Sequence, residues 1–187
     1  KDMEKEAAIK KDNVSIFDQN AHFKSYLTFE YLAVLLNYTN LCLEGKQYDQ
    51  VDYLISQARQ FAGNNGIFKR PLVYFHYAAV KASFERKKWK AIVNEGIENE
   101  VIKFQIEKER IALLIYCYLS LTYMALEKPK KVQAYIRLMH QCHPESRAYF
   151  EELIQVIELI LHYETRDEII LANLINSIQR RGKSPKS

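Results

Sequence analysis

The apolar positions of this chain recur at helical spacing, and the predicted helices return at a nearly constant interval. Between residues 21 and 43 eight apolar side chains follow steps of three and four, which places them on one helix face, the predicted core face. They are Phe23, Leu27, Tyr31, Val34, Leu35, Tyr38, Leu41 and Cys42. A short polar turn precedes a second amphipathic segment, and this order repeats three more times. No period-two alternation is long enough to predict a strand. We therefore expect eight helices in four hairpins: 21–43 and 48–62, 71–85 and 88–98, 103–127 and 129–141, 145–163 and 166–180.

Four anchor residues, Tyr48, Trp89, Pro129 and Asp167, mark the turns of these hairpins. They follow one another at intervals of 41, 40 and 38 residues. Two aliphatic or small residues recur three and seven positions after each anchor: Val51 and Ile55, Ile92 and Gly96, Val132 and Ile136, Ile170 and Leu174. A fixed period of this size predicts stacked hairpins, each covering the apolar face of its neighbour. We expect Trp89 to lie between the two helices of its hairpin.

Composition supports long helices. Five glycines and four prolines among 187 residues are too few for an all-β fold with many tight turns. The predicted fold is an all-α solenoid of about four antiparallel hairpins spanning residues 21–181, followed by a basic tail at 182–187. Residues 1–20 form a partial helix or a linker. Residues 1–12 are either the second helix of an earlier hairpin or a frayed terminal helix, and the sequence does not separate the two.

The repeat resembles a degenerate tetratricopeptide repeat. The residues that carry this resemblance are Leu119-Ser120-x-x-Tyr123 in the third hairpin, Tyr48, Val51, Ile55 and Ala58 in the first, and Trp89 in the second. The period is near 40 instead of about 34, the expected small alanine is replaced by larger residues, and the terminal proline is absent. The segment at 153–181 also looks like the end of uncharacterised bacterial helical-repeat proteins. The resemblance implies a scaffold and carries over no catalytic residues.

The sequence holds no recognisable catalytic or metal-binding motif. It lacks a glycine-rich phosphate loop, C-x-x-C, H-E-x-x-H and G-x-S-x-G. His140, Cys142 and His143 form the one metal-like cluster, but three ligands within four positions cannot converge from one helix end, so we interpret them as a helix terminus. Cys42 and Cys117 lie in apolar runs and should pack as small hydrophobic residues. We therefore expect a protein that is not an enzyme and has no cofactor.

The most apolar run, residues 111–126, is too short for a membrane span of about 20 residues. It predicts a central buried helix instead. Reduced thiols and the absence of a targeting segment favour the cytoplasm.

Positive side chains gather at the predicted hairpin turns, forming a basic edge. Its members are Lys46, Arg86, Lys87, Lys88, Lys90, Lys128, Lys130, Lys131 and Arg166. The edge could bind nucleic acid or an acidic partner, or it could stabilise the carbonyl ends of the preceding helices. We prefer the second interpretation, because a net charge of +4 is low for a phosphate binder, and we expect nucleic acid not to be the partner.

The helix at 71–85 carries two aromatic faces. Val73, His76, Val80 and Ser83 lie on the face needed to pack its hairpin partner. Tyr74, Tyr77 and Lys81 lie on another, and we predict that they border a peptide groove, although neighbouring helices could also cover both faces. The predicted function is a protein–protein interaction or scaffolding module that presents a concave face of first helices. The alternative is a regulatory domain of a larger protein that binds a ligand or nucleic acid through the basic edge.

Overall fold

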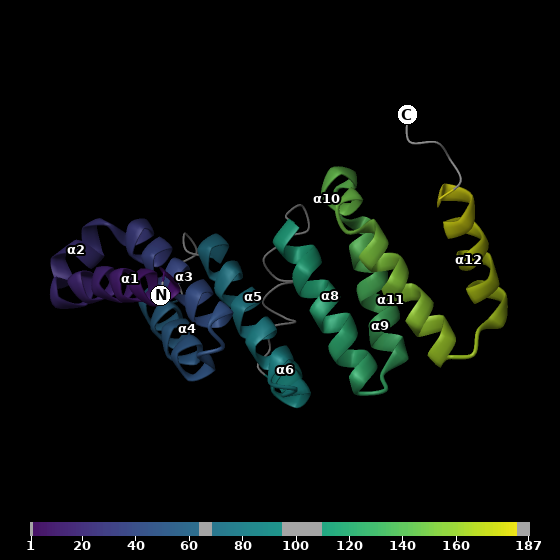
Figure 1. Ribbon diagram of the computed structural model, residues 1–187, viewed down its shortest axis with the longest axis horizontal. Coiled ribbons are helices and arrows are strands. Elements are labelled where there is room, and N and C mark those ends of the chain that lie inside the picture. The colour runs from purple at the N-terminus through teal and green to yellow at the C-terminus, as the bar shows by residue number, and fades with distance from the viewer. Residues whose placement is uncertain (1, 64–68, 95–109, 183–187) are drawn as a thin grey trace. The chain divides into compact units, whose positions relative to one another are not determined.

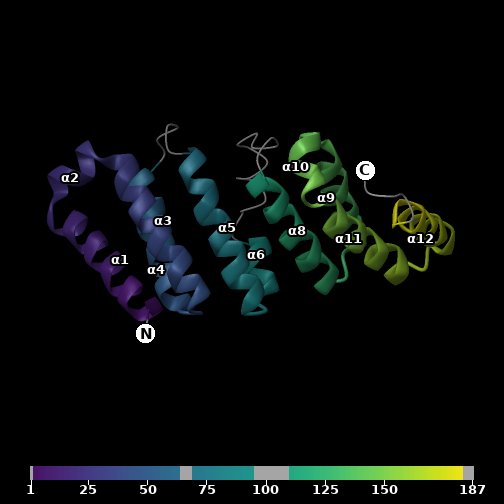
Figure 2. The ribbon, with the colours of Figure 1, turned by 45° about the horizontal axis from the view of Figure 1, so that its top comes forward.

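The computed structural model describes residues 2–63, 69–94 and 110–182 (Figure 1, Figure 2). Over these ranges the chain forms eleven α-helices and no strand, so the predicted all-α class is confirmed. No helix in the described ranges is long and apolar enough to cross a membrane. The chain divides into two compact units, Lys1–Phe104 and Gln105–Ser187.

The N-terminal unit is built around α3. Its helices are α1 (Asp2–Gln19), α2 (Ala21–Tyr26), α3 (Thr28–Glu44), α4 (Tyr48–Ala62), α5 (Lys69–Glu85) and α6 (Trp89–Asn94). Helix α3 packs against α1, α4 and α5, and α4 also packs against α5. Side chains from α3, α4 and α5 form the core, where the fully buried ones include Leu35, Val51, Leu54, Phe75 and Val80. The pairs α3/α4 and α5/α6 are the first two predicted hairpins.

The C-terminal unit is built around α8. Its helices are α8 (Arg110–Ala125), α9 (Pro129–Gln141), α10 (Pro144–Ala148), α11 (Glu151–Glu164) and α12 (Glu168–Gly182). Helix α8 packs against α9 and α11, and α11 packs against α12. Leu113, Ile115 and Tyr116 of α8 are buried, which confirms that the most apolar run forms a central helix. The rings of Tyr123 and Tyr135 stack between α8 and α9 with centroids 5.7 Å apart.

The same turn connects the two helices of all four hairpins. Two positions after the end of each first helix stands a residue with φ between 55° and 57°: Lys46, Lys87, Glu127 and Arg166. The next residue donates its backbone N–H to the carbonyl five positions back at 2.8–2.9 Å: Gln47 to Cys42, Lys88 to Ser83, Lys128 to Tyr123 and Asp167 to His162. This is a Schellman motif, which usually carries glycine at the left-handed position. Here non-glycine residues adopt that conformation four times, so the four hairpins share this turn.

The predicted anchors mark the start of the second helices. Helices α4 and α9 begin at Tyr48 and Pro129, as predicted, and α6 begins at Trp89, one residue after its predicted start at 88. The fourth begins at Glu168, and Asp167 is the residue before it, whose Oδ1 accepts the backbone N–H of Ile170 at 3.2 Å.

The predicted register of the fourth hairpin is therefore wrong by one residue. The equivalent of Val51 is Leu171, and Ile170 is 41% exposed instead of buried. In the other three hairpins the first aliphatic position, Val51, Ile92 or Val132, is fully buried. Asp167 does not open its helix as the other three anchors do, because it precedes the helix and its carboxylate caps the first turn.

The anchors differ in what their side chains do. Tyr48 is half-buried, and its hydroxyl donates to Oε2 of Glu85 at 2.9 Å, which links the first hairpin to the second. Trp89 is also half-buried and contacts Phe84 edge to face, with ring centroids 4.8 Å apart. Pro129 is exposed, so it favours the helix start through its fixed φ and not through packing.

Two predicted helices are broken. The segment expected at 21–43 bends at Leu27, with φ −111° and ψ 53°, and becomes α2 and α3. The segment expected at 145–163 is interrupted at Tyr149 and Phe150 and becomes α10 and α11. Neither break contains glycine or proline. The expected helix ends at 95–98 and 103–109, together with Gly96 and the tail from 183, lie outside the described residues.

The N-terminal segment forms a packed helix. Helix α1 runs to Gln19 and packs against α3. The rings of Phe17 and Tyr31 lie 5.4 Å apart, and the Tyr31 hydroxyl donates to Oδ1 of Asp18 at 3.1 Å. Residues 2–19 are therefore part of the unit's structure and not a linker.

Candidate functional site

An apolar groove lies between α3 and α5 in the N-terminal unit. Its volume is about 420 Å³. It is lined by Phe29, Leu32, Ala33, Leu36, Pro71, Tyr74 and Phe75. Phe29 is 54% exposed and Tyr74 is 39% exposed, whereas Leu32 and Phe75 are buried. The groove thus has a buried aliphatic and aromatic floor with an accessible ring on each side.

Helical spacing on both helices produces this groove. Phe29, Ala33 and Leu36 follow steps of four and three along α3, so they share one face. Because Ala33 is small, it leaves open the space that a longer side chain would fill. On α5, Pro71 and Tyr74 share a face at a step of three, and Pro71 lies in the first turn, where its missing N–H leaves no helical hydrogen bond unmade.

The two predicted faces of α5 are separate in the structure. All four residues of the face predicted to pack the hairpin partner are buried: Val73, His76, Val80 and Ser83. The ring of His76 contacts Arg59 of α4. Tyr74 lies in the groove wall. Tyr77 and Lys81 are half-buried on the following turns, outside the groove lining, and Lys81 Nζ lies 4.0 Å from Oε1 of Glu85. A role for Tyr74, Tyr77 and Lys81 in partner binding stays a prediction.

The α3 wall was not predicted as part of a site. Phe29, Ala33 and Leu36 lie on a second apolar stripe beside the one that packs α3 into the core. That stripe was a signal in the sequence, because Phe29 and Leu36 fall off the predicted core face. The sequence of a single helix does not show, however, which neighbouring helix will pack beside that stripe.

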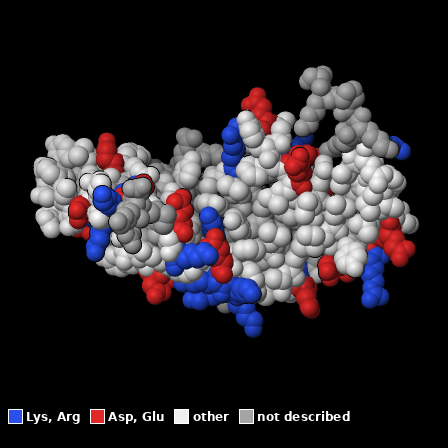
Figure 3. Space-filling view, viewed as in Figure 1, with Lys and Arg blue, Asp and Glu red and all other residues white. Residues whose placement is uncertain are grey.

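The basic edge is partly neutralised in the N-terminal unit. Figure 3 shows Lys and Arg side chains gathered over the end of α5 and over α6. Arg86 pairs with Asp52 through two contacts, Nη1–Oδ2 at 2.7 Å and Nη2–Oδ1 at 2.9 Å. Lys46, Arg86 and Lys88 line a polar hollow of about 460 Å³ beside the turns, together with Asp49. This mixture of charges is consistent with either interpretation of the edge.

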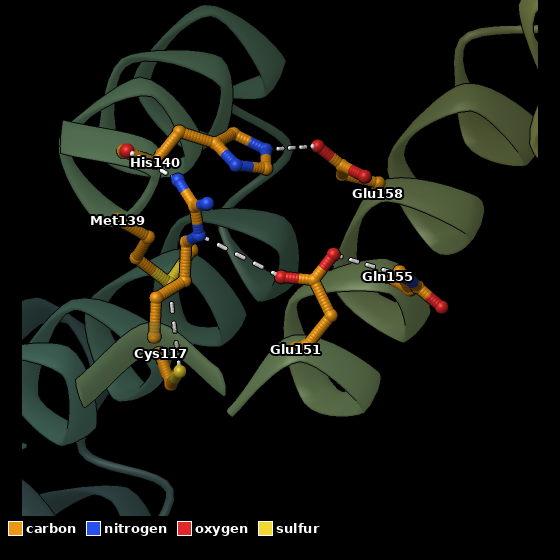
Figure 4. A network of polar contacts seen from close by, with 7 residues as sticks. Cys117, Met139, His140, Glu151, Gln155 and Glu158 are labelled. Carbon is orange, nitrogen blue, oxygen red and sulfur yellow. Dashed lines mark hydrogen bonds and ion pairs between the residues drawn. The ribbon is translucent and has the colours of Figure 1, made fainter. Parts of the chain in front are cut away.

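A polar network in the C-terminal unit joins α9, α10 and α11 (Figure 4). His140 Nε2 lies 2.7 Å from Oε1 of Glu158, and Nη1 of Arg147 donates to the His140 carbonyl at 2.9 Å. Glu151 accepts a hydrogen bond from Gln155 at 3.2 Å and lies 3.8 Å from Nε of Arg147. The His140 ring is thus directed at a carboxylate of the neighbouring helix.

The thiols beside this network are buried. Cys117 Sγ lies 3.5 Å from the Met139 sulfur, and burial, with a smaller contribution from Cys142, raises the pKa of Cys117 to about 12. A thiol with so high a pKa carries almost no thiolate at neutral pH and is a poor nucleophile. The described residues bring no three His, Cys, Asp or Glu side chains together as a metal site.

The C-terminal unit has a larger hollow of about 590 Å³, between the α8–α9 turn and α11. Its apolar wall residues Val132 and Leu161 are buried, and its outer wall carries Glu127, Lys128 and Glu164. Accessible aromatic rings are absent from its lining, so it offers a partner fewer apolar anchors than the α3–α5 groove.

Comparison with known proteins gives no relative from which a function could be transferred. No family model, no curated protein and no solved structure matches this chain. The resemblance to tetratricopeptide repeats therefore stays a prediction that rests on the residues themselves.

Proposed function

We propose that this chain is a non-enzymatic protein-binding module that holds an apolar peptide segment of its partner in the α3–α5 groove. The observation that carries this proposal is the placement of Phe29 and Tyr74, both accessible, on either side of a buried apolar floor. Aromatic residues at the edge of a concave apolar surface are typical of binding sites. The sequence pattern also predicts that Tyr74 borders a peptide groove.

The chemistry of the walls defines the partner. Every lining side chain is apolar except for the hydroxyl of Tyr74. A charged segment would lose its hydration there without gaining a partner, whereas aliphatic or aromatic side chains would replace water at the exposed rings. The ligand is therefore a peptide with two or more large apolar anchors.

We also propose that the four hairpins are tetratricopeptide-like repeats of one solenoid. Two features support this: the same Schellman turn ends the first helix of each hairpin, and an aliphatic residue is buried three positions into the second helix of three of them. In such arrays the first helices line the binding surface. The groove uses the first helices of two successive hairpins.

Peptide selection tests the proposal. A displayed random peptide library is selected against the full chain, and the dissociation constants of the enriched peptides are measured. We expect peptides with paired apolar anchors. The double variant Phe29→Ser, Tyr74→Ser should weaken their binding about tenfold or more, because truncated aromatic anchors dominate such interfaces.

Tyr53 supplies the matched control. It is a 55% exposed tyrosine of α4 in the same unit, outside the groove lining. Tyr53→Ser should leave the dissociation constants unchanged. The proposal fails if no peptide is enriched, or if the double variant binds as tightly as the wild type. It also fails if the double variant is unfolded by circular dichroism, because the two rings would then be part of the core.

A further inference from the structure

A second hollow in the N-terminal unit, between α4 and the α5–α6 hairpin, differs from the groove in chemistry. Its volume is about 250 Å³. Three of its lining residues are basic, one is acidic, two carry hydroxyls and three are aliphatic: Arg59, Arg86, Lys88, Asp52, Ser56, Ser83, Ile55, Ala79 and Ala91. It is too small for most drug-sized ligands but has room for one compact polar group.

The positive charge of this hollow is not balanced. Arg86 and Asp52 neutralise each other through their two contacts. Arg59 and Lys88 make no ion pair with any carboxylate in the described part of the chain. Arg59 is half-buried, and its Nε is shielded from solvent without a hydrogen bond to a described residue. A guanidinium that is partly removed from water without a counter-ion is costly, and a bound anion would offset that cost.

His76 positions Arg59 and does not neutralise it. The Nη2 of Arg59 lies 3.5 Å from Nδ1 of His76, which is 2% exposed. Because a guanidinium can only donate, Nδ1 must be the acceptor, and the imidazole is then the neutral tautomer protonated at Nε2. Burial and the charge of Arg59 lower the pKa of His76 to about 4, so it stays neutral at pH 7. The two groups together hold a positive charge against one wall of the hollow.

We propose that this hollow binds one oxyanion, a phosphate or a carboxylate group, through the guanidinium of Arg59 and the ammonium of Lys88. The hydroxyls of Ser56 and Ser83 are further donors in the lining. Arginine suits this role because its planar fork matches two oxygens of a phosphate or carboxylate. The Arg86–Asp52 pair also lines the hollow and adds no net charge. The site is separate from the α3–α5 groove, since the two linings share no residue.

Titration of the full chain tests this site. Inorganic phosphate, acetate and phosphoserine are added at constant ionic strength made up with chloride, and binding is followed by calorimetry and by nuclear magnetic resonance. We expect saturable binding in the millimolar range or tighter. Arg59→Gln and Lys88→Gln should each weaken it about tenfold, the loss of one charge-assisted contact.

Lys90 supplies the matched control, because it is an exposed lysine of α6 outside the lining. Lys90→Gln should keep wild-type affinity. An equal loss in Lys90→Gln would show diffuse attraction by the basic edge and overturn the proposal. Unchanged anion affinity in Arg59→Gln and Lys88→Gln would also overturn the proposal, as would the absence of saturable binding by all three probes.

Two further measurements complete the test: a comparison of peptides identifies the source of the anion, and melting temperatures show how the substitution changes stability. A phosphoserine peptide that binds more tightly than phosphate, while its unphosphorylated form does not bind, points to a modified protein. Equal affinity for the peptide and for phosphate points to a free small anion.

Without anion, Arg59→Gln should melt at or above the wild-type temperature, because it removes an unpaired charge. Because the variant also removes the hydrogen-bond donor to His76, its melting temperature is compared with that of His76→Gln, which lacks the same contact. A melting temperature clearly below that of His76→Gln would show that Arg59 already has a counter-ion.

Discussion

Acidification should destabilise the N-terminal unit through His76. This side chain of α5 is 2% exposed, and its pKa is lowered from 6.5 to about 4, first by burial and second by the charge of Arg59. The unfolded chain takes up a proton near pH 6.5, whereas the folded chain takes it up only near pH 4. The stability associated with neutral His76 is therefore fully present above pH 6.5 and is lost progressively as the pH falls toward 4.

The size of the effect follows from the two pKa values. The folded and unfolded values differ by about 2.5 units, which corresponds to about 3 kcal/mol when the pH is below both. Between pH 7 and pH 5 the loss from this one histidine is about 2 kcal/mol. Other groups also titrate over this interval, so the prediction concerns the difference between the wild type and a variant that lacks the imidazole.

Urea unfolding at pH 7 and pH 5 measures that difference. Trp89 is the one tryptophan of the chain and lies in the N-terminal unit, so its fluorescence reports on the unit that contains His76. His76→Gln should lose about 2 kcal/mol less than the wild type between the two pH values. His143→Gln, which changes an exposed histidine of the other unit, should follow the wild type. The reasoning is refuted if His76→Gln and the wild type lose the same stability on acidification.

Three other changes test the turns, the anchor and the thiols. Glu127→Gly should raise the free energy of unfolding by about 1 kcal/mol relative to Glu127→Ala, because φ is 55° there and glycine adopts that conformation without strain; equal stabilities would contradict this. Trp89→Ala should lower it by about 2 kcal/mol, less than for a fully buried ring, since Trp89 is half-buried against Phe84, and an unchanged melt would contradict this packing. Iodoacetamide should modify Cys117 only after unfolding, because the thiol is buried and its pKa is raised to about 12; rapid labelling in native buffer would show otherwise.

The sequence was sufficient for the hairpins because their determinants are local. Apolar steps of three and four, and residues suited to opening a helix, predicted α4 and α9 with their observed starts at Tyr48 and Pro129. The conformation of the turns was harder to predict from the sequence. Schellman turns normally reveal themselves by glycine, and at Lys46, Lys87 and Glu127 the chain places a charged residue in that position instead.

The breaks depend on contacts that a single helix does not reveal. At Leu27 the helix bends, and the Thr28 hydroxyl donates to the carbonyls of Lys24 and Ser25. Threonine side chains that hydrogen-bond to preceding carbonyls are known to bend helices, but the sequence alone does not show which threonine will do so.

Only one wall of the groove, the one on α5, was predicted from the sequence. The face of α5 that carries Tyr74 could be separated from the core face by spacing alone. The opposite wall, Phe29 and Leu36, exists only because α3 packs beside α5, which is a tertiary contact between hairpins. Tyr77 and Lys81 share the predicted stripe with Tyr74 but lie on later turns, where the groove no longer extends.

Site-specific photo-crosslinking is the most direct test of the central claim that the α3–α5 groove holds a peptide. A benzophenone amino acid replaces Tyr74 in one variant and Tyr53 in another, and each is irradiated with a peptide selected on the wild-type chain. We predict a covalent adduct from position 74 that excess unlabelled peptide abolishes, and only background from position 53, which is more exposed but lies outside the groove. Equal adduct from both positions, or adduct from position 53 alone, would contradict it.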